Sequence, residues 1–190
     1  TMLRGVCKKE NFLDLFENFI LYDHSGGNTA KILARNHQYL GVNEAMKAYA
    51  ARKLNGGKLG VFWHTQGSGK SYSMVFLAQK IRRKVEGSPT FVILTDREEL
   101  NAQISDTFEN CGLLGKTKAS QFIASSGDDL MQKLKGNPSF IFTLIQKFNK
   151  PNEEAIYPDH DIIIMSDEAH RSQYGVFADN MMKLLPTAAR

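Results

Sequence analysis

The sequence has few cysteines, and the two that it has, Cys7 and Cys111, lie far apart in the chain. Neither belongs to a Cys-x-x-Cys pair, and the five histidines show no ligand-like spacing, so neither a disulfide framework nor a zinc site is indicated. The sequence also lacks an apolar run of the ~18 residues that cross a bilayer, and a hydrophobic signal core at its N-terminus. We therefore expect reduced thiols in a cytoplasmic protein that has no membrane partner.

A strong charge of either sign is missing as well. The 24 Lys and Arg residues and 20 Asp and Glu residues give a net charge of +4, which permits a polyanionic partner without requiring one. With 42% hydrophobic and 23% charged residues among 190, the composition is that of one globular domain and excludes a disordered or fibrous chain. Because the start, Thr1-Met2-Leu3-Arg4-Gly5, does not resemble a natural N-terminus, we expect a piece of a longer protein.

The sequence changes character near Asn55-Gly56-Gly57. Before this point, apolar residues recur at helical spacing in two stretches, residues 12–20 and 39–54, with the break Ser25-Gly26-Gly27-Asn28 between them. The glycine pair is typical of a helix C-cap. We therefore expect residues 1–56 to form a helical lead-in and residues 57–190 to form a separate domain.

Four short apolar runs alternate with helix-like segments after Gly57. The runs have four to six residues and are rich in Val, Ile or Phe: Gly60–Trp63, Phe91–Leu94, Phe140–Ile145 and Ile162–Met165. Such continuous apolar runs are typical of strands that are buried on both faces. The helix-like segments are Lys70–Lys84, Arg97–Asn110, Asp128–Lys135 and Tyr174–Leu185. The alternation predicts an α/β domain with a mostly parallel sheet and helices on both faces, which binds ligands at the carboxyl ends of its strands.

A glycine-rich segment joins the first run to the first helix of this domain: His64-Thr65-Gln66-Gly67-Ser68-Gly69-Lys70-Ser71. Glycines allow backbone N–H groups to approach phosphate oxygens, and the helix that follows adds the positive end of its dipole. We predict a P-loop in which Lys70 reaches the β- and γ-phosphates of ATP and Ser71 binds Mg²⁺. The other ATP-binding residues of the loop are predicted to be Gln66, Gly67, Ser68 and Gly69. The first glycine of the consensus is His64 here, and Gly67 can supply the missing backbone freedom.

Two adjacent carboxylates, Asp167 and Glu168, follow the last apolar run. In nucleotide hydrolysis such a pair has two distinct roles. Asp167 is predicted to hold Mg²⁺, and Glu168 to orient and deprotonate the attacking water. With Lys70 they form the predicted catalytic set. His170 lies next to the pair, and we expect it to couple the nucleotide site to a neighbouring lobe.

Together, the P-loop and the acidic pair resemble the first motor lobe of a superfamily 2 helicase or translocase. Longer strings resemble the R (restriction and motor) subunit of type I restriction–modification enzymes over roughly residues 10–190. These strings are Trp63-His64-Thr65-Gln66-Gly67-Ser68-Gly69-Lys70-Ser71, Leu94-Thr95-Asp96-Arg97, Gln146-Lys147-Phe148 and Asp167-Glu168-Ala169-His170-Arg171-Ser172-Gln173. The resemblance implies a RecA-like P-loop fold for residues 57–190, truncated at its C-terminal end.

The resemblance also implies an activity for the full-length protein, a type I site-specific deoxyribonuclease. ATP and Mg²⁺ would be its cofactors, and ATP hydrolysis would drive translocation along double-stranded DNA before a separate nuclease domain, not contained in this sequence, cleaves the duplex. The methylation and specificity subunits would be its partners. Because the second motor lobe is not within these 190 residues, the isolated chain is expected to be nearly inactive.

Individual residues take roles from the same resemblance. Gln38, in Arg35-Asn36-His37-Gln38, stands where the family carries a glutamine that recognises adenine, although the residues alone also allow a polar helix surface. The segments after the second and third apolar runs are implied to line the DNA path or to brace the nucleotide site, through Thr95, Arg97, Gln103, Thr143, Gln146 and Lys147. Hydroxyl, amide and backbone N–H groups can hold DNA phosphates without reading bases.

Two other functions stay open from the residues. A small kinase also joins a P-loop to a parallel sheet, and a nucleotide-dependent switch would bind without turnover. A carboxylate directly after Asp167 favours water as the phosphate acceptor, and therefore hydrolysis over phosphotransfer. The segment Arg97-Glu98-Glu99 is equally a helix N-terminal turn with favourably placed acids.

Overall fold

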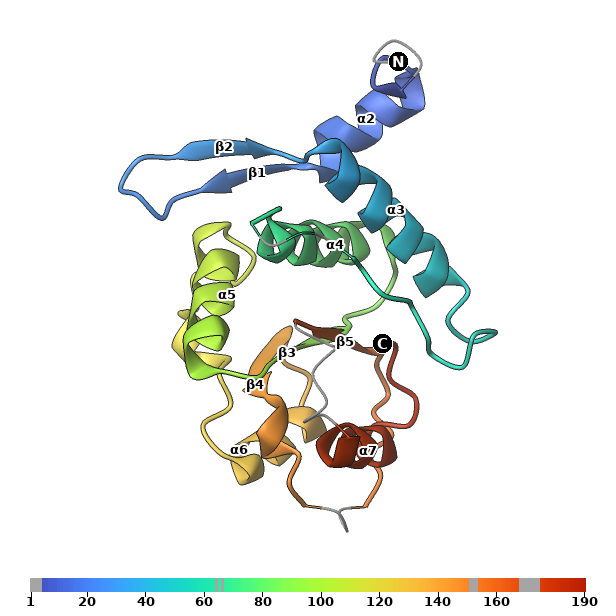
Figure 1. The fold of residues 1–190 in the computed structure, drawn as a ribbon, viewed down its shortest axis with the longest axis vertical. Helices are drawn as coiled ribbons and strands as arrows, with labels where there is room; N and C mark the ends of the chain where they lie inside the picture. Colours follow the sequence, from blue (N-terminus) through green and yellow to red (C-terminus); the bar gives the residue numbers. More distant parts are fainter. Residues whose placement is uncertain (1–4, 64, 66, 151–153, 168–174) are drawn as a thin grey trace.

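A sheet of three parallel strands forms the centre of the fold (Figure 1). The computed structural model describes residues 5–63, 65, 67–150, 154–167 and 175–190. The strands are β3 (Thr90–Thr95), β4 (Phe140–Leu144) and β5 (Ile162–Ser166), in the order β4-β3-β5. Every residue of the central strand β3 is buried, as a strand with neighbours on both edges and helices on both faces requires. Three of the four predicted strands are thereby confirmed.

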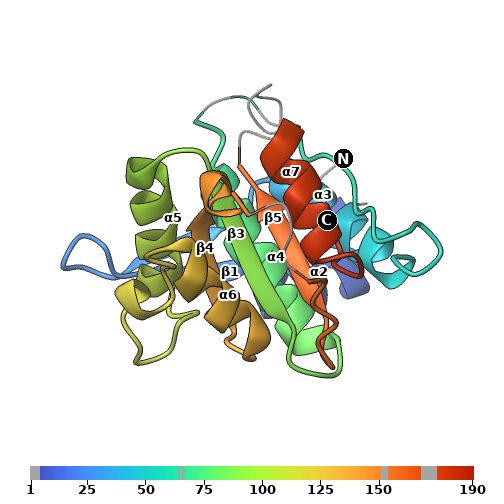
Figure 2. The same ribbon diagram turned by 90° about the horizontal axis from the view of Figure 1, so that it is seen from below.

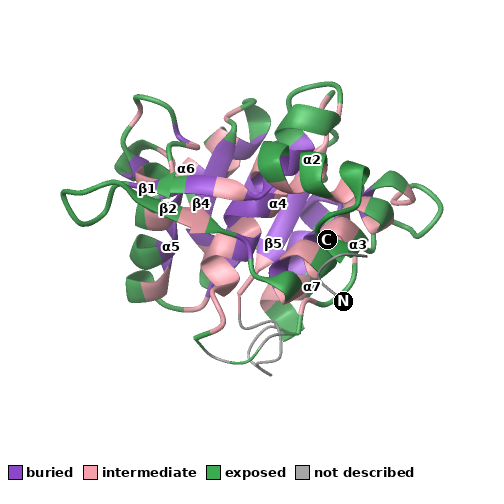
Figure 3. Cartoon of the chain, turned by 90° about the horizontal axis from the view of Figure 1, so that it is seen from above, coloured by how far each residue is buried: buried purple, intermediate pink, exposed green. Residues whose placement is uncertain are grey.

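Four helices cover the two faces of this sheet (Figures 1 and 2). They are α4 (Lys70–Lys84), α5 (Glu98–Asn110), α6 (Gly127–Lys135) and α7 (Gly175–Leu184). Successive residues of β3 point to opposite faces, so Phe91 and Ile93 join the core beneath α4 and α5, whereas Val92 and Leu94 join the core beneath α6 and α7. The predicted α/β class with helices on both faces is therefore observed. Figure 3 shows the buried residues concentrated in the sheet and on the inner sides of the helices.

Short 3-10 turns and a capped helix start connect these elements. The turns are η1 (Ala119–Gln121) and η2 (Ile145–Lys147), so the predicted third run leaves the sheet at Leu144. Helix α6 begins where the sequence indicates a helix start, because the Ser126 hydroxyl accepts a hydrogen bond from the backbone N–H of Asp129 at 3.1 Å. In return, the Asp129 carboxylate accepts a hydrogen bond from the backbone N–H of Ser125 at 2.7 Å.

The N-terminal region contains a β-hairpin between its helices, which the sequence analysis did not predict. Its elements are α2 (Lys9–Asn18), β1 (Ile20–Asp23), β2 (Ala30–Leu33) and α3 (Asn36–Ala50). The two strands are antiparallel, with Ile20 opposite Leu33, and Gly27 in the connecting turn has a φ of +73°. The apolar residues up to Ile20 fit a helical period, but the helix ends at Asn18 and Ile20 starts the strand. A Gly-Gly turn between two short apolar segments is the hairpin signal in this sequence.

The first predicted strand, Gly60–Trp63, is not a strand in the structure. The backbone N–H of Arg190 donates to Gly57 O at 2.7 Å, and that of Leu59 donates to Arg190 O at 2.5 Å, so this segment pairs with backbone only before it reaches the predicted run. Pairing gives a strand its hydrogen bonds, and the described backbone beside residues 60–63 supplies none. The side chains of this segment are not buried as those of a central strand would be, since Trp63 is 84% exposed. The prediction of a buried strand there was wrong.

Candidate nucleotide site

The P-loop leads into α4 through two glycines with left-handed backbone. Gly67 has a φ of +76°, and Gly69, the N-cap of α4, has a φ of +87°. Only glycine adopts these values without strain, and they turn the loop so that the free N–H groups of the first helical turn face outward. The carbonyl of Gly69 accepts hydrogen bonds from the backbone N–H and the hydroxyl of Ser73, at 3.1 and 3.3 Å. The chain thus presents a helix N-terminus suited to an anion.

Lys70 and Asp167 meet at this helix N-terminus. Their Nζ and Oδ1 atoms are 3.8 Å apart, and both side chains are partly exposed. Asp167 follows β5 directly, and its backbone N–H donates to Leu94 O at 2.9 Å, so the sheet itself fixes its position. The carboxyl end of the strand and the amino end of α4 therefore bring together two residues that are far apart in sequence. Ser71 lies beside them in the first turn of α4 and is half-buried.

Three predicted site residues, Gln66, Glu168 and His170, lie outside the described residues, and their roles stay predictions. Among the residues that the structure does describe, no group of three or more His, Cys, Asp or Glu side chains could hold a metal ion. Magnesium in nucleotide sites needs no such cage, because one or two protein oxygens, the phosphates and water complete its shell. The Asp167 carboxylate and the Ser71 hydroxyl fit this requirement.

Gln38 connects the N-terminal region to the P-loop. Its side chain is buried, with the residue only 3% exposed, so the interpretation as a polar helix surface was wrong. Its Nε2 donates to Gly69 O at 3.0 Å, and its Oε1 accepts from the backbone N–H of Arg35 at 2.8 Å. The neighbouring His37 places Nε2 3.2 Å from Ser68 O. The first turn of α3 therefore lies against the loop, while recognition of adenine stays a prediction.

The other candidates lie at the carboxyl ends of β3 and β4, except Gln103, which lies within α5, and their exposure differs. Thr95 and Thr143 are fully buried, so in this structure their hydroxyl groups can brace the site but cannot reach DNA. The exposed residues are Arg97, Gln103 and Gln146, and Lys147 is half-buried. The segments after β3 and β4 are joined by one hydrogen bond, from Gln146 Nε2 to Asp96 O at 3.0 Å. Lys147 Nζ donates to Ala124 O, in the segment that precedes α6.

Tyr72 is a contact of the site that the sequence analysis missed. It lies in the first turn of α4, and its hydroxyl donates to the Asp23 carboxylate at the end of β1. This hydrogen bond, with burial, raises the pKa of Tyr72 to about 12. The same bond lowers the pKa of Asp23, whose carboxylate also accepts from the backbone N–H of Ser25 at 2.8 Å. The unpredicted hairpin thus braces the helix that carries Lys70.

Comparison with known proteins now decides the family. The SWI2/SNF2 ATPase family matches residues 37–190, a span that includes the P-loop, Gln38 and Asp167. The chain belongs to the SWI2/SNF2 ATPase family. Its α/β fold is accordingly the RecA-like P-loop fold that the resemblance implied. Membership also implies that the chain binds a nucleotide.

Relatives of this SWI2/SNF2 ATPase chain confirm the resemblance to R subunits. The chain is 42% identical over 185 residues to the type I restriction enzyme HindI endonuclease subunit of Haemophilus influenzae, covering 92% of this chain and 17% of that protein. It is 35% identical over 199 residues to a Methanocaldococcus jannaschii protein provisionally named type I restriction enzyme MjaIXP endonuclease subunit, covering 99% and 18%. It thus spans less than a fifth of the length of these relatives. In the described part of the chain, no helix is both long and apolar enough for a membrane crossing.

Proposed function

We propose that this chain is the ATP-binding motor lobe of a type I restriction enzyme R subunit. In the full protein, ATP hydrolysis drives translocation of double-stranded DNA before a separate domain cleaves the duplex. The observation that carries the proposal is the 3.8 Å approach of Lys70 and Asp167 at the N-terminus of α4. A cation and a carboxylate in this position are the protein's two charged contributions to a Mg²⁺-nucleotide site.

Different groups of the P-loop bind different parts of the triphosphate. The backbone N–H groups of the loop after Gly67 and the dipole of α4 hold phosphate oxygens. Lys70 neutralises charge on the β- and γ-phosphates, and Ser71 and Asp167 hold Mg²⁺, which supplies charge stabilisation for phosphoryl transfer. Glu168 orients and deprotonates the attacking water.

Exposed residues next to this site provide the DNA contacts. Arg97 and Gln146 directly follow β3 and β4, at the same sheet edge as Asp167, and Gln103 lies on α5, the helix that follows β3. An Arg and two amides contact the phosphate backbone without reading bases, which suits a motor that moves along any sequence. The hydrogen bond from Gln146 to Asp96 O transmits movement between the two loops. His170 couples this edge to the second motor lobe.

The names of the relatives, endonuclease subunits of type I restriction enzymes, support an assembly of several subunits. Methylation and specificity subunits bind the full protein and bring it to its DNA. The isolated 190-residue chain binds nucleotide weakly and hydrolyses little, because hydrolysis in such motors takes place in the cleft between two lobes. The division of the chain at residues 56 and 57 and the cytoplasmic location stay predictions.

Replacement of Glu168 tests the proposal in the full-length protein. The Glu168→Gln variant should bind ATP and duplex DNA together and retain both, with hydrolysis reduced about 100-fold or more, because the general base is lost. Filter binding with labelled ATP and labelled DNA measures the trapped complex. The matched control is Glu99→Gln, which removes an exposed carboxylate from α5 and should leave turnover intact. Continued phosphate transfer to a non-water acceptor by the Glu168→Gln variant would instead support a kinase.

A further inference from the structure

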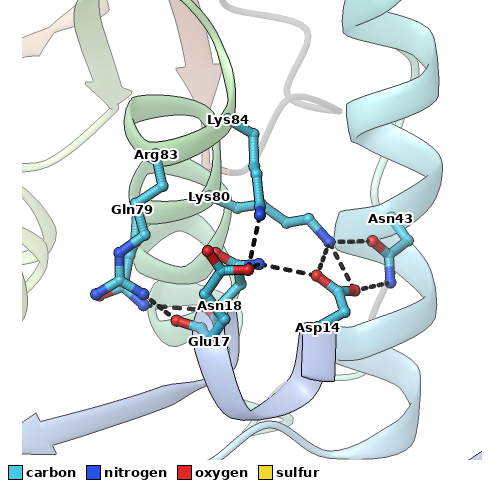
Figure 4. Close-up of polar contacts among 8 residues, drawn as sticks. All are labelled: Asp14, Glu17, Asn18, Asn43, Gln79, Lys80, Arg83 and Lys84. Carbon is cyan, nitrogen blue, oxygen red and sulfur yellow. Dashed lines mark hydrogen bonds and ion pairs between the residues drawn. The ribbon is translucent and has the colours of Figure 1, made fainter. Parts of the chain in front are cut away.

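A buried lysine joins three helices beneath the nucleotide site (Figure 4). Lys80 of α4 is 7% exposed, and its ammonium donates to both carboxylate oxygens of Asp14 on α2, at 2.5 and 2.7 Å. It also donates to Asn43 Oδ1 on α3 at 2.6 Å. All three N–H groups of the ammonium thus have a partner. Its Nζ lies 4.8 Å from the centre of the Phe19 ring, which covers the group.

The stability of the fold does not require such a charge in this place. Removing an ammonium group from water is costly, and a buried ion pair is often no more stable than apolar residues of similar volume. A buried charge with all its hydrogen bonds made does fix the positions of its partners, because a partner that moves leaves the charge unsatisfied. Asp14 is itself held, since it accepts from Asn18 Nδ2 at 2.9 Å.

Helix α3 is attached to α4 at two points by polar contacts. One is the hydrogen bond of Gln38 to Gly69 O, at the start of both helices. The other is the bond of Asn43 to Lys80, which lies further along both helices. One contact leaves a helix free to slide or tilt about it, whereas two separated contacts fix its direction. Beside the apolar packing of α3 on α4, the bond of Asn43 to Lys80 therefore adds a second polar restraint on the direction of α3, and with it on the place of the Gln38 amide.

We propose that Asp14, Asn43 and Lys80 form a positioning node that holds the first turn of α3, and the Gln38 amide with it, for the selection of adenine over other bases. The inference rests on the proposed function and on the predicted recognition of adenine by Gln38. It assigns the N-terminal helix α2 a part in nucleotide selection, since Asp14 supplies the carboxylate of the node. None of the three residues touches the nucleotide.

Direct binding of Mg·ATP and Mg·GTP to the full-length protein, measured by calorimetry, tests the node. Wild type should prefer ATP. The variant Asn43→Ala removes the bond of α3 to Lys80 but keeps the pair of Lys80 with Asp14. It should lower the ratio of ATP to GTP affinity about tenfold through the displaced Gln38 hydrogen bond. Lys80→Met should do the same. The affinity for GTP should fall much less than that for ATP, because the P-loop residues themselves are unaltered.

Two comparisons separate positioning from a general loss of stability. Lys84→Met is the matched control, since Lys84 lies one turn further along α4 and also pairs with α2, through Glu17 at 2.6 Å, but on the surface and without contact to α3. It should leave the ratio unchanged. In a Gln38→Ala background, Asn43→Ala should cause no further loss, because the node acts through Gln38.

A wild-type affinity ratio in folded Asn43→Ala protein would overturn the inference, as would a loss that adds fully to that of Gln38→Ala. Either result leaves the proposed function standing. Absence of ATP binding by the wild type would instead refute the proposed function, and the node with it. Unfolding of Lys80→Met does not decide the matter, because Asn43→Ala keeps the buried ion pair and carries the test alone.

Discussion

Replacing the two P-loop glycines separately measures how much the contact of Gln38 with the loop contributes. Both positions have left-handed backbone, which costs a residue with a Cβ atom about 1 kcal/mol. At Gly67 a Cβ atom would meet open space, with nothing within 4 Å. At Gly69 it would lie 3.0 Å from Gln38 Nε2, closer than ordinary packing allows. The two substitutions therefore share the cost of left-handed backbone, and only Gly69→Ala adds a close contact with the Gln38 side chain.

The expected free energies of unfolding follow from these terms. Gly67→Ala should lower the stability of the 190-residue chain by about 1 kcal/mol. Gly69→Ala should lower it by about 2 kcal/mol, because Gln38 must also shift and its buried hydrogen bond to the Gly69 carbonyl is weakened. Urea unfolding followed by far-UV circular dichroism gives both values. In a Gln38→Ala background the difference between the two variants should vanish.

Equal losses for the two glycine variants would refute this reasoning, since they would mean that Gln38 does not press against the loop. A difference that persists after Gln38→Ala would refute it as well, and would point to another contact of a Cβ atom at Gly69. The candidate for such a contact is Tyr72, whose ring would lie 3.7 Å from that atom.

Three further predictions concern groups away from the loop. Tyr49→Phe removes the hydroxyl that donates to Asp161 at 2.8 Å, and should cost about 1 to 2 kcal/mol in the same urea assay because the acceptor is charged. Burial raises the pKa of Asp14, but hydrogen bonds from Lys80 and Asn18 outweigh burial and hold the pKa below its usual value. The ionised Asp14 carboxylate therefore stabilises the fold above pH ~4, and this contribution is lost as the pH falls through the folded pKa. The difference in unfolding free energy between wild type and Asp14→Asn should shrink below pH ~4, and a constant difference would contradict this prediction. Burial raises the pKa of the Cys111 thiol to about 12, so at pH 8 a disulfide reagent should modify the exposed Cys7 rapidly and Cys111 only on unfolding.

The sequence was most informative where one local pattern determines the structure. The runs that became β3, β4 and β5 are apolar on consecutive residues, a pattern that a strand between two helical layers requires wherever its neighbours lie. The P-loop helix has the predicted bounds, Lys70–Lys84, because its glycine N-cap is a local signal. The approach of Lys70 and Asp167 was also predicted, although the strand expected before the P-loop is absent: Asp167 directly follows β5, and α4 begins beside it.

The features that sequence reasoning missed depend on distant parts of the chain. Residues 60–63 have the composition of a strand, but a strand forms only with a paired neighbour, and the pairing of this segment with Arg190 stops at Leu59. Lys80 reads as a solvated charge on a helix, and only the packing of α2 and α3 on α4 makes it the buried centre of a polar cluster. The bond of Gln38 to Gly69 O likewise joins two segments that no local rule places together.

The most direct test of the account is the steady-state ATPase rate of the full-length protein, with and without double-stranded DNA that carries its recognition site. A motor that couples the site at Lys70 and Asp167 to movement along DNA should hydrolyse ATP at least tenfold faster with the duplex. Lys70→Ala should abolish the stimulated rate. An ATPase rate that is the same in the presence and absence of DNA would contradict the account.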